Sequence, residues 1–532
     1  MNDQHRRVLV TDPLAQPGIE LLSREAEVDV RLGLRGADLV AAIEGYDALV
    51  VRSETKVTRE VIEAGRNLQV IGRAGVGVDN IDLDAATERG IVVVNAPLGN
   101  IVSAAEHTIA LLCALARNIP QADASLRSGR WERSRFVGVE LRGKTLGIIG
   151  LGQVGSEVAR RARGLEMHVL AHDPFVSPER ASVLGVDLVT LDDLLARSDF
   201  VTLHTILTDA TRGLIGAAQL AKMKPTARLI NTARGGLVDE AALLDAVQRG
   251  VIAGAAVDVF SEEPAPPDHP FLREPRIIVT PHLGASTREA QERVAVDVAE
   301  QVLAVLRGQP ALYAVNAPMI PVETMAVIGP YLVVAEKVAS LATQLAEGQL
   351  ERVEIEYQGD IANYDTTPLR AAVIKGLLGP VSEENVTLVN AMLVAEQRGI
   401  RIVERTSPGG EVFTNLVTVH IHTSGGEDAT VSGTLAHDGP RVVRMDGFWV
   451  DIPTNVPYLL LCENLDRPGM VGKVGTLLGG YNVNISGMHL GRTAVRGRAL
   501  MALGLDDPMP PEALEQLRAL EDIYRARVVK VS

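Results

Sequence analysis

The chain has 532 residues and a formal net charge of −15, because 67 acidic residues outnumber 52 basic ones. Its length predicts three or four domains, and its acidity argues against nucleic acid as a general partner, since phosphate binding needs a basic surface. Aromatic residues make up only 3% of the chain, which leaves few rings for base stacking. The two cysteines, Cys113 and Cys462, lie in apolar runs without metal-ligand spacing, so we expect neither a disulfide scaffold nor a metal site.

The composition favours a protein of the cytoplasm. Residues 1–7 are polar and lead directly into a strand-like run, so they do not resemble a signal peptide. We find no uninterrupted apolar run that approaches the ~18 residues of a membrane span. A hydrophobic content of 46% is enough to build several cores.

The first 284 residues repeat a βαβ rhythm, in which short runs rich in Val and Ile alternate with helical patterns. Such runs predict parallel sheets buried on both faces. Residues 1–98 give one α/β lobe, residues 99–284 a doubly wound α/β domain, and a helix within 285–316 returns the chain to the first lobe. The predicted strands are 8–11, 28–30, 48–51, 70–71, 91–94, 145–149, 168–171, 200–203, 229–231, 255–259 and 277–280; the long helices are 103–117, 239–249 and 285–307.

Beyond residue 316 the pattern changes. Residues 317–452 predict a separate α+β domain, with alternating strands at 353–358 and 412–422 and helices near 367–378 and 386–398. Pro453 and Pro457 bracket a short linker. Residues 456–532 then follow a β-α-β-β-α-β order, which is typical of the ferredoxin-like fold.

A dinucleotide fingerprint follows the predicted strand 145–149. Gly150, Gly152 and Gly155 form GxGxxG between a strand and a helix, where the glycines allow a tight turn and the approach of a pyrophosphate. Asp173 ends the next strand, where a carboxylate holds ribose hydroxyls and repels a 2′-phosphate. The sequence therefore predicts NAD rather than NADP. A second glycine cluster, residues 72–77, has another order and predicts a close-approach turn.

Three polar residues follow strands of the same domain, where ligand sites of α/β sheets form. Arg234 offers a planar fork for a carboxylate, and His282 offers a proton donor and acceptor near neutral pH. Glu263 offers a carboxylate that can orient the imidazole. Together they favour hydride transfer between a dinucleotide and a 2-hydroxy acid.

This constellation, with the fingerprint and the split first lobe, resembles the D-isomer-specific 2-hydroxyacid dehydrogenases over residues 1–315. The resemblance implies that Arg234 binds the substrate carboxylate and carbonyl, that His282 is the acid/base and that Glu263 is its partner. The residues it implies for NAD binding are Gly150, Gly152, Gln153, Val154, Gly155, Asp173, Thr205, Ala233 and Asp258.

Two further features resemble the long-form branch of that family, whose members oxidise 3-phosphoglycerate at the first step of serine synthesis. Arg52 and Ser53 end a strand of the first lobe and, with Asn100, would bind the phosphate. The acidic Glu54 departs from the sequence motif that is common in the family at this place. The C-terminal segment is similar to an ACT domain, in which Asn464, Asp466 and Asn484 would bind an amino acid such as L-serine. Effector binding between paired modules implies a homo-oligomer, expected to be a tetramer.

Alternatives stay open at this point. Another 2-hydroxyacid dehydrogenase, such as a hydroxypyruvate or glyoxylate reductase, differs by lacking a preference for phosphate. A nucleotide-sensing scaffold without catalytic turnover would keep the fold but would not need Arg234, Glu263 and His282. The sequence assigns no ligand to residues 317–452, and we interpret His420 and His422, on one face of a predicted strand, as its solvated side.

Overall fold

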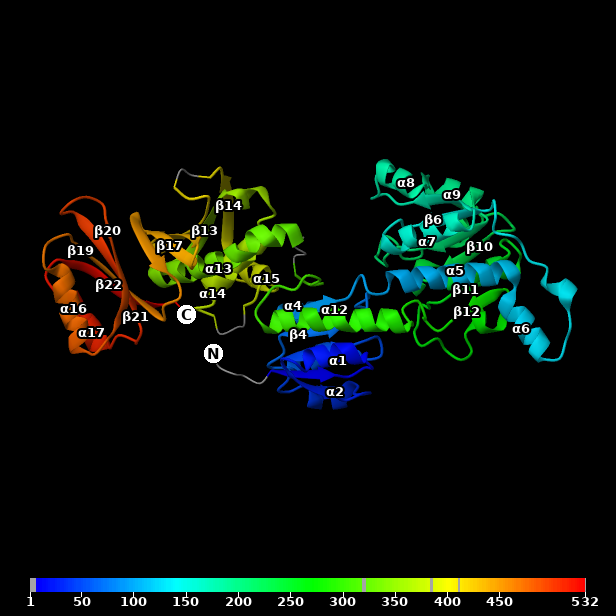
Figure 1. Cartoon of the computed structure of the whole chain (residues 1–532), viewed down its shortest axis with the longest axis horizontal. Helices are drawn as coiled ribbons and strands as arrows, with labels where there is room; N and C mark the ends of the chain where they lie inside the picture. Colours follow the sequence, from blue (N-terminus) through cyan, green and yellow to red (C-terminus); the bar gives the residue numbers. More distant parts are fainter. Residues whose placement is uncertain (1–5, 318–321, 383–385, 410–411, 532) are drawn as a thin grey trace.

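A computed structural model describes residues 6–317, 322–382, 386–409 and 412–531. The described residues form four β-sheets spread along an elongated molecule (Figure 1). Pro318, in the boundary expected near residue 317, and residues 1–5 of the polar N-terminus lie outside the described ranges.

The first lobe is a parallel sheet of order β2-β1-β3-β4-β5. Its strands are nearly all apolar because helices cover both faces. Helices α1 and α12 pack on one face, and α2, α3 and α4 pack on the other. The elements are β1 Arg7–Val10, α1 Gln16–Leu22, β2 Glu27–Val30, α2 Gly36–Ala42, β3 Ala48–Val51, α3 Arg59–Ala64, β4 Val70–Arg73, α4 Leu83–Glu88, β5 Val92–Asn95 and α12 Arg288–Leu306.

The second lobe is a seven-stranded parallel sheet of order β12-β11-β10-β9-β6-β7-β8. Helices α5, α7 and α8 contribute to the core on one face, and α9, α10 and α11 to the core on the other. This confirms the doubly wound α/β prediction. The strands are β6 Thr145–Ile149, β7 His168–His172, β8 Asp187–Leu188, β9 Phe200–Leu203, β10 Arg228–Asn231, β11 Gly254–Val257 and β12 Ile277–Val279; the helices are α5 Ile101–Arg117, α6 Ile119–Arg127, α7 Gln153–Gly164, α8 Pro178–Leu184, α9 Leu191–Arg197, α10 Ala217–Leu220 and α11 Glu240–Gln248, and the short 3₁₀ turns of this lobe are Arg133–Phe136, Gly235–Leu237 and Pro270–Arg273.

Two long helices carry the chain between these lobes (Figure 1). Helix α5 leaves the first sheet and packs on the second, and α12 returns and packs against β4 and β5. Their starts are joined by a 2.7 Å hydrogen bond between the hydroxyls of Ser103 and Thr287. The predicted return helix is thus present, and the two lobes meet where both helices begin.

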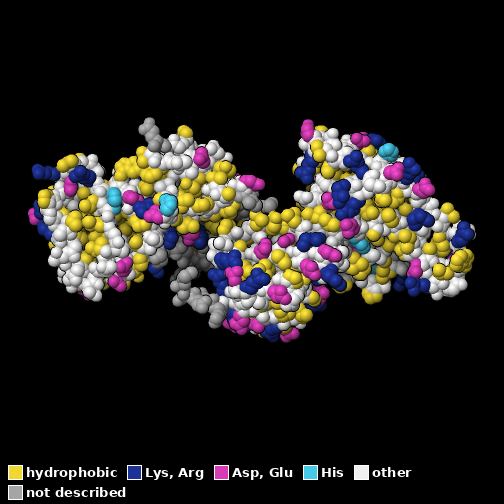
Figure 2. All heavy atoms as spheres, viewed as in Figure 1, with side chains coloured by type: hydrophobic (Ala, Val, Ile, Leu, Met, Phe, Trp, Pro, Cys, Tyr) yellow, Lys and Arg dark blue, Asp and Glu magenta, His cyan; other side chains and the backbone are white. Residues whose placement is uncertain are grey.

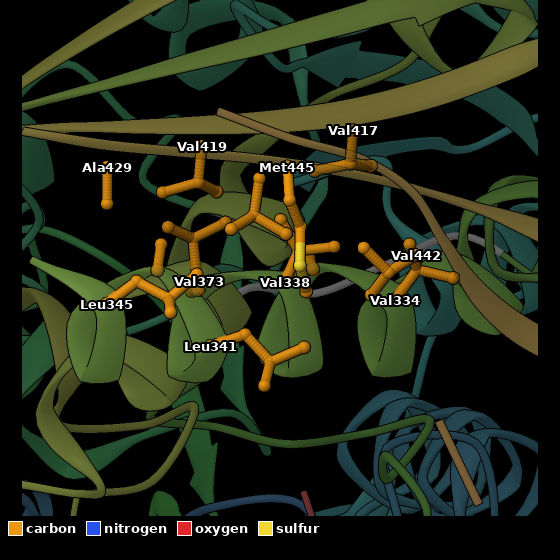
Figure 3. Packing of buried hydrophobic residues seen from close by; sticks show 14 of the residues in the cluster. Val334, Val338, Leu341, Leu345, Val373, Val417, Val419, Ala429, Val442 and Met445 are labelled. Atoms are coloured by element: carbon orange, nitrogen blue, oxygen red, sulfur yellow. The ribbon is translucent and has the colours of Figure 1, made fainter. Parts of the chain in front are cut away.

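The third sheet is mixed, with the order β14-β13-β15-β16-β17-β18. Helix α13 lies under it, and Figure 3 shows Val334 and Val338 of this helix facing strand residues such as Val417 and Val442. The elements are α13 Val322–Leu345, β13 Glu347–Gly359, α14 Thr367–Leu378, α15 Ala391–Gln397, β14 Arg401–Ser407, β15 Asn415–Glu427, β16 Ala429–Ala436, β17 Gly439–Met445 and β18 Phe448–Pro453, with a 3₁₀ turn at Asp360–Asn363.

Helix α13 has the length and apolar composition of a membrane span over Glu323–Leu345. Half of that stretch is buried inside the folded chain, where it packs against α14, β15 and β16. A helix that is apolar on most sides is expected at the centre of a core. Packing within this domain therefore accounts for its composition.

The C-terminal sheet has the order β20-β21-β19-β22 and is antiparallel. Helices α16 and α17 cover one face, as the β-α-β-β-α-β order predicts. The other face packs on the third sheet and α13, through Leu459, Leu461 and Val529. The elements are β19 Tyr458–Leu465, α16 Met470–Gly480, β20 Ile485–Arg492, β21 Arg498–Leu505, α17 Pro511–Arg518 and β22 Ile523–Lys530.

Candidate active site

The glycine-rich turn between β6 and α7 is built by close backbone approach. Gly150 has φ +93°, and a Cβ atom there would lie 2.5 Å from the His204 carbonyl oxygen. A Cβ at Gly155 would lie 2.1 Å from the Gly150 carbonyl oxygen. At Gly152, by contrast, an added Cβ meets no described atom within 4 Å. The turn is therefore closed on the protein side and open where α7 begins, as a pyrophosphate cradle requires.

Asp173 lies beside this turn, just after β7. Its Oδ2 accepts a hydrogen bond from the Leu151 amide at 2.8 Å, and its Oδ1 accepts one from the Phe175 amide at 2.9 Å. The carboxylate is thus held against the glycine loop. Each oxygen keeps a second lone pair with which it can accept a ribose hydroxyl.

The other cofactor residues lie around the same edge of the sheet. Gln153 and Val154 form the first turn of α7, and Thr205 and Ala233 follow β9 and β10. The Thr205 hydroxyl oxygen is buried without a hydrogen-bond partner among the described residues. A buried unpaired hydroxyl beside an open glycine turn fits a site that a polar cofactor completes.

His282 and Glu263 form a hydrogen-bonded pair. His282 Nδ1 lies 2.7 Å from Glu263 Oε2, and Glu263 Oε1 accepts a 3.0 Å hydrogen bond from the Phe260 amide. Burial alone would raise the pKa of Glu263, but the hydrogen bonds from His282 and Phe260 outweigh it and hold that pKa below its ordinary value. The charged carboxylate therefore fixes the ring by its Nδ1 and leaves Nε2 to exchange a proton.

Asp258 supports the loop that carries His282. Its side chain is buried, and it accepts hydrogen bonds from the Thr280 hydroxyl and from the amides of Leu283 and Gly284. Burial alone would raise its pKa, but hydrogen bonds from His107, Thr280 and the Leu283 amide outweigh burial and lower that pKa. The predicted contact of Asp258 with the nicotinamide stays a prediction, because this geometry gives the carboxylate a positioning role.

His107, on α5, is a neighbour that the sequence interpretation missed. Its Nε2 lies 3.1 Å from Asp258 Oδ1 and 3.3 Å from the Thr280 hydroxyl. The two residues are 151 positions apart. Only the packing of α5 on the second sheet brings them together, so no local sequence signal identifies the contact.

Arg234 follows β10 and reaches toward the first lobe. Its Nε lies 3.6 Å from Asp79 Oδ2, and a Cβ at Gly77 would lie 2.4 Å from its Nη2. Its own loop packs on the Glu263 segment, because a Cβ at Gly235 would meet the Phe260 backbone at 2.0 Å. The guanidinium therefore reaches from the second lobe to Gly77 and Asp79 of the first.

Arg73, at the end of β4, is a second residue that the sequence interpretation missed. Burial, together with the positive charges of Arg234 and Arg52, lowers the pKa of Arg73 to about 10. Its Nε is buried without a hydrogen-bond partner among the described residues. The glycine cluster at 72–77 makes room for it, since a Cβ at Gly75 would overlap its Nη1 at 1.4 Å. The sequence does contain a signal for this residue, since Arg73 ends a strand inside the glycine cluster 72–77.

Arg52 and Ser53 lie at the end of β3, on the same lobe. The Arg52 amide donates to the buried Asp12 at 2.6 Å, which fixes the backbone of this turn. Glu54 pairs with Arg35 at 3.2 Å, and both side chains are exposed. Asn100 is the N-cap of α5, with no hydrogen bond from its side chain to the helix.

The three predicted effector residues do not meet within one chain. Asn464 and Asp466 lie at the end of β19, where Leu465 pairs with Arg498. Asn484 precedes Ile485, which pairs with Leu505 at the opposite end of the sheet. Asn464 is 2% exposed, and its Oδ1 is buried without a partner among the described residues. A single site can therefore use Asn464 and Asp466 at the end of β19, but not Asn484 of the same chain.

Models of three protein families match the chain in order. Residues 109–284 match the NAD-binding domain of D-isomer-specific 2-hydroxyacid dehydrogenases. Residues 327–446 match the intervening domain of D-3-phosphoglycerate dehydrogenase, and residues 458–522 match the ACT domain. The matches cover the second sheet, the third sheet except β18, and the C-terminal sheet except β22.

Full-length relatives support the same grouping. A D-3-phosphoglycerate dehydrogenase from Synechocystis sp. is 47% identical, covering 99% of this chain and 95% of that one. Another, from Archaeoglobus fulgidus, is 45% identical, covering 99% of this chain and all of the relative.

Solved structures resemble the first two lobes. A glyoxylate reductase from Paecilomyes thermophila has a TM-score of 0.54 and 32% identity, covering 59% of this chain and 98% of that one. A D-lactate dehydrogenase from Escherichia coli has a TM-score of 0.53 and 27% identity, covering 58% and 99%. Because these titles name different activities, the shared lobes do not identify a substrate. The family matches and the full-length relatives show that the chain belongs to the D-isomer-specific 2-hydroxyacid dehydrogenases that use NAD, in the D-3-phosphoglycerate dehydrogenase branch with an intervening domain and an ACT domain.

Proposed function

We propose that the protein oxidises 3-phospho-D-glycerate to 3-phosphooxypyruvate with NAD, at the first step of L-serine synthesis. The observation that carries the substrate is the convergence of Arg52 and Arg234 on Arg73, whose pKa is lowered by burial and by those two positive charges. Three guanidinium groups match a ligand with one carboxylate and one dianionic phosphate. The relatives named for this activity cover the whole chain.

In the proposed reaction, Arg234 holds the substrate carboxylate by bidentate hydrogen bonds. His282 Nε2 takes the proton of the C2 hydroxyl, because Nδ1 is engaged with Glu263. The β6–α7 turn and Asp173 would hold NAD, which would supply the acceptor for the hydride from C2 as C2 becomes a carbonyl carbon. Glu263 stabilises the imidazolium that forms, and the reverse reduction uses the same imidazolium as the acid.

Phosphate binding is assigned to the first lobe. We propose that Arg73 acts there together with the predicted residues Arg52, Ser53 and Asn100. The buried, unpaired Nε of Arg73 supports this assignment, since a buried cation needs a counter-charge. Glu54 does not oppose it, because its carboxylate is engaged with Arg35.

For the C-terminal module we propose L-serine as the effector and a homo-oligomer, expected to be a tetramer, as the working state. Strand β20 is an edge strand, and its Met488 and Leu490 side chains are 48% and 46% exposed. Antiparallel pairing of two such edges about a two-fold axis would bring Asn484 of the partner subunit toward the end where Asp466 contacts Arg492. The three predicted residues would then form one site between two copies.

The proposed division of labour follows the predicted domains. The substrate binds to residues 1–98 and 285–316, and NAD binds to residues 99–284. Residues 317–452 connect these lobes to the C-terminal domain, and residues 456–532 regulate the dehydrogenase. We also propose a cytoplasmic location.

Figure 2 shows acidic and basic side chains interspersed on the visible face, where basic groups do not gather as nucleic-acid binding would require.

The test is NADH oxidation by the purified full-length protein, with 3-phosphooxypyruvate and with hydroxypyruvate. The proposal expects kcat/KM for the phosphorylated substrate to be at least about 100-fold higher, since two or more charged hydrogen bonds are at stake. Equal values would favour a general hydroxypyruvate or glyoxylate reductase. An absence of turnover with both would favour the nucleotide-sensing scaffold.

Serine is tested in the same assay. The proposal expects L-serine to lower the rate and Asp466→Asn to abolish that effect, while the rate without serine is unchanged. Asp507→Asn, an exposed position beyond β21, is the matched control. Inhibition that survives in the Asp466 variant would place the effector elsewhere.

A further inference from the structure

The third sheet carries a cluster of potential metal ligands that the dehydrogenase chemistry does not use. His420 and His422 lie on one face of β15, and Asp428 lies in the turn between β15 and β16. One ligand atom from each lies within 4.8 Å of the others. The opposite face of β15 carries the buried Val419 and Ile421, so alternation along the strand places both histidines on the polar side.

We propose that His420, His422 and Asp428 bind one divalent transition-metal ion, with zinc as the best match. Two imidazoles and a carboxylate are a donor set that Zn²⁺ favours. Tetrahedral ligands at about 2.0–2.1 Å from the ion lie roughly 3.4 Å apart, so modest side-chain rotation closes the site. The side chains of His420, His422 and Asp428 are 35%, 27% and 48% exposed, which leaves a path for the ion and room for water as a fourth ligand.

His420 already has the outer partner that a ligating histidine needs. Its Nδ1 lies 2.6 Å from the Thr430 hydroxyl on β16, and its Nε2 points toward Asp428, 3.9 Å from Oδ2. With Nδ1–H donating to Thr430, Nε2 carries the lone pair for the metal. Thr430 is itself anchored, because its amide donates to Asp446 at 2.8 Å.

His422 and Asp428 lie within hydrogen-bond distance of each other, and each has a further partner of its own. His422 Nδ1 lies 3.1 Å from Asp428 Oδ2, and Asp428 Oδ1 accepts from the Thr423 amide at 3.0 Å. Metal binding replaces the proton on Nδ1. The proton then resides on Nε2, which lies 3.5 Å from Glu354 Oε1 and can donate to it. Glu354 thus supplies the carboxylate behind the ligating imidazole.

Arg352 is the group that must move. Its Nη2 lies 3.1 Å from His422 Nε2 and 2.7 Å from Glu354 Oε1. Its side chain is 40% exposed, so it can keep the ion pair with Glu354 while releasing His422. Around the cluster, the negative charges of Asp428, Glu354 and Asp446 all act on His420 and favour a cation there. The opposing positive charges are Arg352 and Arg405, which pair with Glu354, and Arg525, which acts on Asp446.

The proposed metal site lies next to the contact between the intervening domain and strand β22 of the C-terminal domain. Glu427, next to Asp428, forms an ion pair with Arg525 on β22 at 2.5 Å. Glu347, which pairs with Glu427 in the sheet, contacts Arg527 on the same strand. A bound ion would fix the β15–β16 turn and, through it, the contact between the intervening and C-terminal domains.

The experiment uses full-length protein freed of metal by chelation and dialysis. Calorimetric titration with Zn²⁺ is expected to give one ion per chain with micromolar or tighter affinity. His420→Gln and His422→Gln are each expected to weaken binding at least tenfold, and Thr430→Val to weaken it by about 10-fold or more through the outer partner. His437→Gln, an exposed histidine in the next turn, is the matched control and should bind like the original chain.

A second readout separates binding from folding. Zn²⁺ should raise the midpoint of thermal unfolding for the original chain and for His437→Gln, but not for the double variant H420Q/H422Q. The double variant should melt normally without metal, because both side chains are partly exposed. Stoichiometric binding of unchanged affinity in that variant would overturn the proposal, as would the absence of micromolar binding in the original chain.

Discussion

A single hydrogen bond determines which ring nitrogen of His282 can exchange a proton. Glu263 holds Nδ1 at 2.7 Å, and the Phe260 amide in turn holds Glu263. Asp258 fixes the backbone of the same loop through the amides at 283 and 284. His282 is therefore oriented by two carboxylates: Glu263 holds its ring, and Asp258 holds the backbone that follows it.

Replacing Glu263 by Gln should lower kcat by about 100-fold, within the range typical of general acid–base catalysis. The KM for substrate and the affinity for NADH should change little, because the carboxylate acts on His282 and not on either ligand. Steady-state kinetics with a separate NADH titration measures both. Glu262→Gln, at the adjacent exposed position, is the control, and equal kcat in the two variants would contradict the role of Glu263.

Asp258 gives a prediction about pH. Its pKa is depressed in the folded chain, so its carboxylate stabilises the fold fully above the unfolded value of about 3.9 and loses that effect as pH falls through the folded pKa. Asp258→Asn should lower the free energy of unfolding by about 2–3 kcal/mol at pH 7. Urea unfolding should show this difference narrowing below about pH 4. A difference that widened on acidification would contradict the assignment, and Asp268→Asn, which is exposed, should match the original chain throughout.

At the scale of elements, the β6–α7 turn depends on glycine for two different reasons. Gly150 adopts φ +93°, which other residues rarely adopt, and Gly155 lies too close to the Gly150 carbonyl for a side chain. The helix start is thereby held against the strand end. Its amides then face the open side at Gly152.

Gly155→Ala should therefore weaken NADH binding at least tenfold and lower the thermal midpoint, because its Cβ would lie 2.1 Å from a backbone oxygen that cannot rotate away. Gly164→Ala, at the other end of α7, meets no described atom within 4 Å and should be neutral or stabilising. Fluorescence titration with NADH and thermal unfolding measure both. Equal behaviour of the two variants would contradict the close-approach account.

The sequence predicted the elements of the two parallel sheets well, because strands buried on both faces are short apolar runs between turn residues. Strand β3 matches the predicted 48–51, and only the two-residue β8 was missed there. In the third domain, α13, β14 and β16–β18 were not predicted. Helix α13 has an apolar surface on most sides, which hides its period, and the edge strand β14 carries polar residues on both faces.

The candidate site was predicted only where a residue follows its own strand. His282, Glu263 and Arg234 could be named from local phrases, and the structure brings His282 and Glu263 together. His107 could not, since Asp258 is 151 positions away, and Arg73, although it ends a strand within a glycine cluster, was interpreted only as part of a turn. Asn484 was grouped with Asn464 on family resemblance, although strand register separates them in one chain.

At the scale of the whole molecule, the C-terminal domain is joined to the intervening domain through a shared core. Leu459, Leu461 and Val529 of its sheet belong to the same cluster as Val338 of α13. Arg525 and Arg527 also donate to the carbonyl of Leu345, at the end of that helix. The C-terminal domain and α13 therefore share one hydrophobic core and its flanking hydrogen bonds.

Deleting residues 457–532 should consequently destabilise the intervening domain rather than simply remove regulation. We expect a lower thermal midpoint and increased binding of a hydrophobic dye, because α13 loses apolar cover. NADH binding should survive, since the second lobe has its own cores. A truncated chain with an unchanged midpoint and no added dye binding would contradict the shared core.

The central claim is that Arg73, with Arg52 and Arg234, selects a phosphorylated 2-hydroxy acid. The most direct test is kcat/KM of Arg73→Gln with 3-phosphooxypyruvate and with hydroxypyruvate, beside the exposed control Arg66→Gln. We predict a loss of about 10- to 100-fold for the phosphorylated substrate, the range for charged hydrogen bonds, and less than about 3-fold for hydroxypyruvate. Equal losses on both substrates, or no loss on either, would contradict the claim.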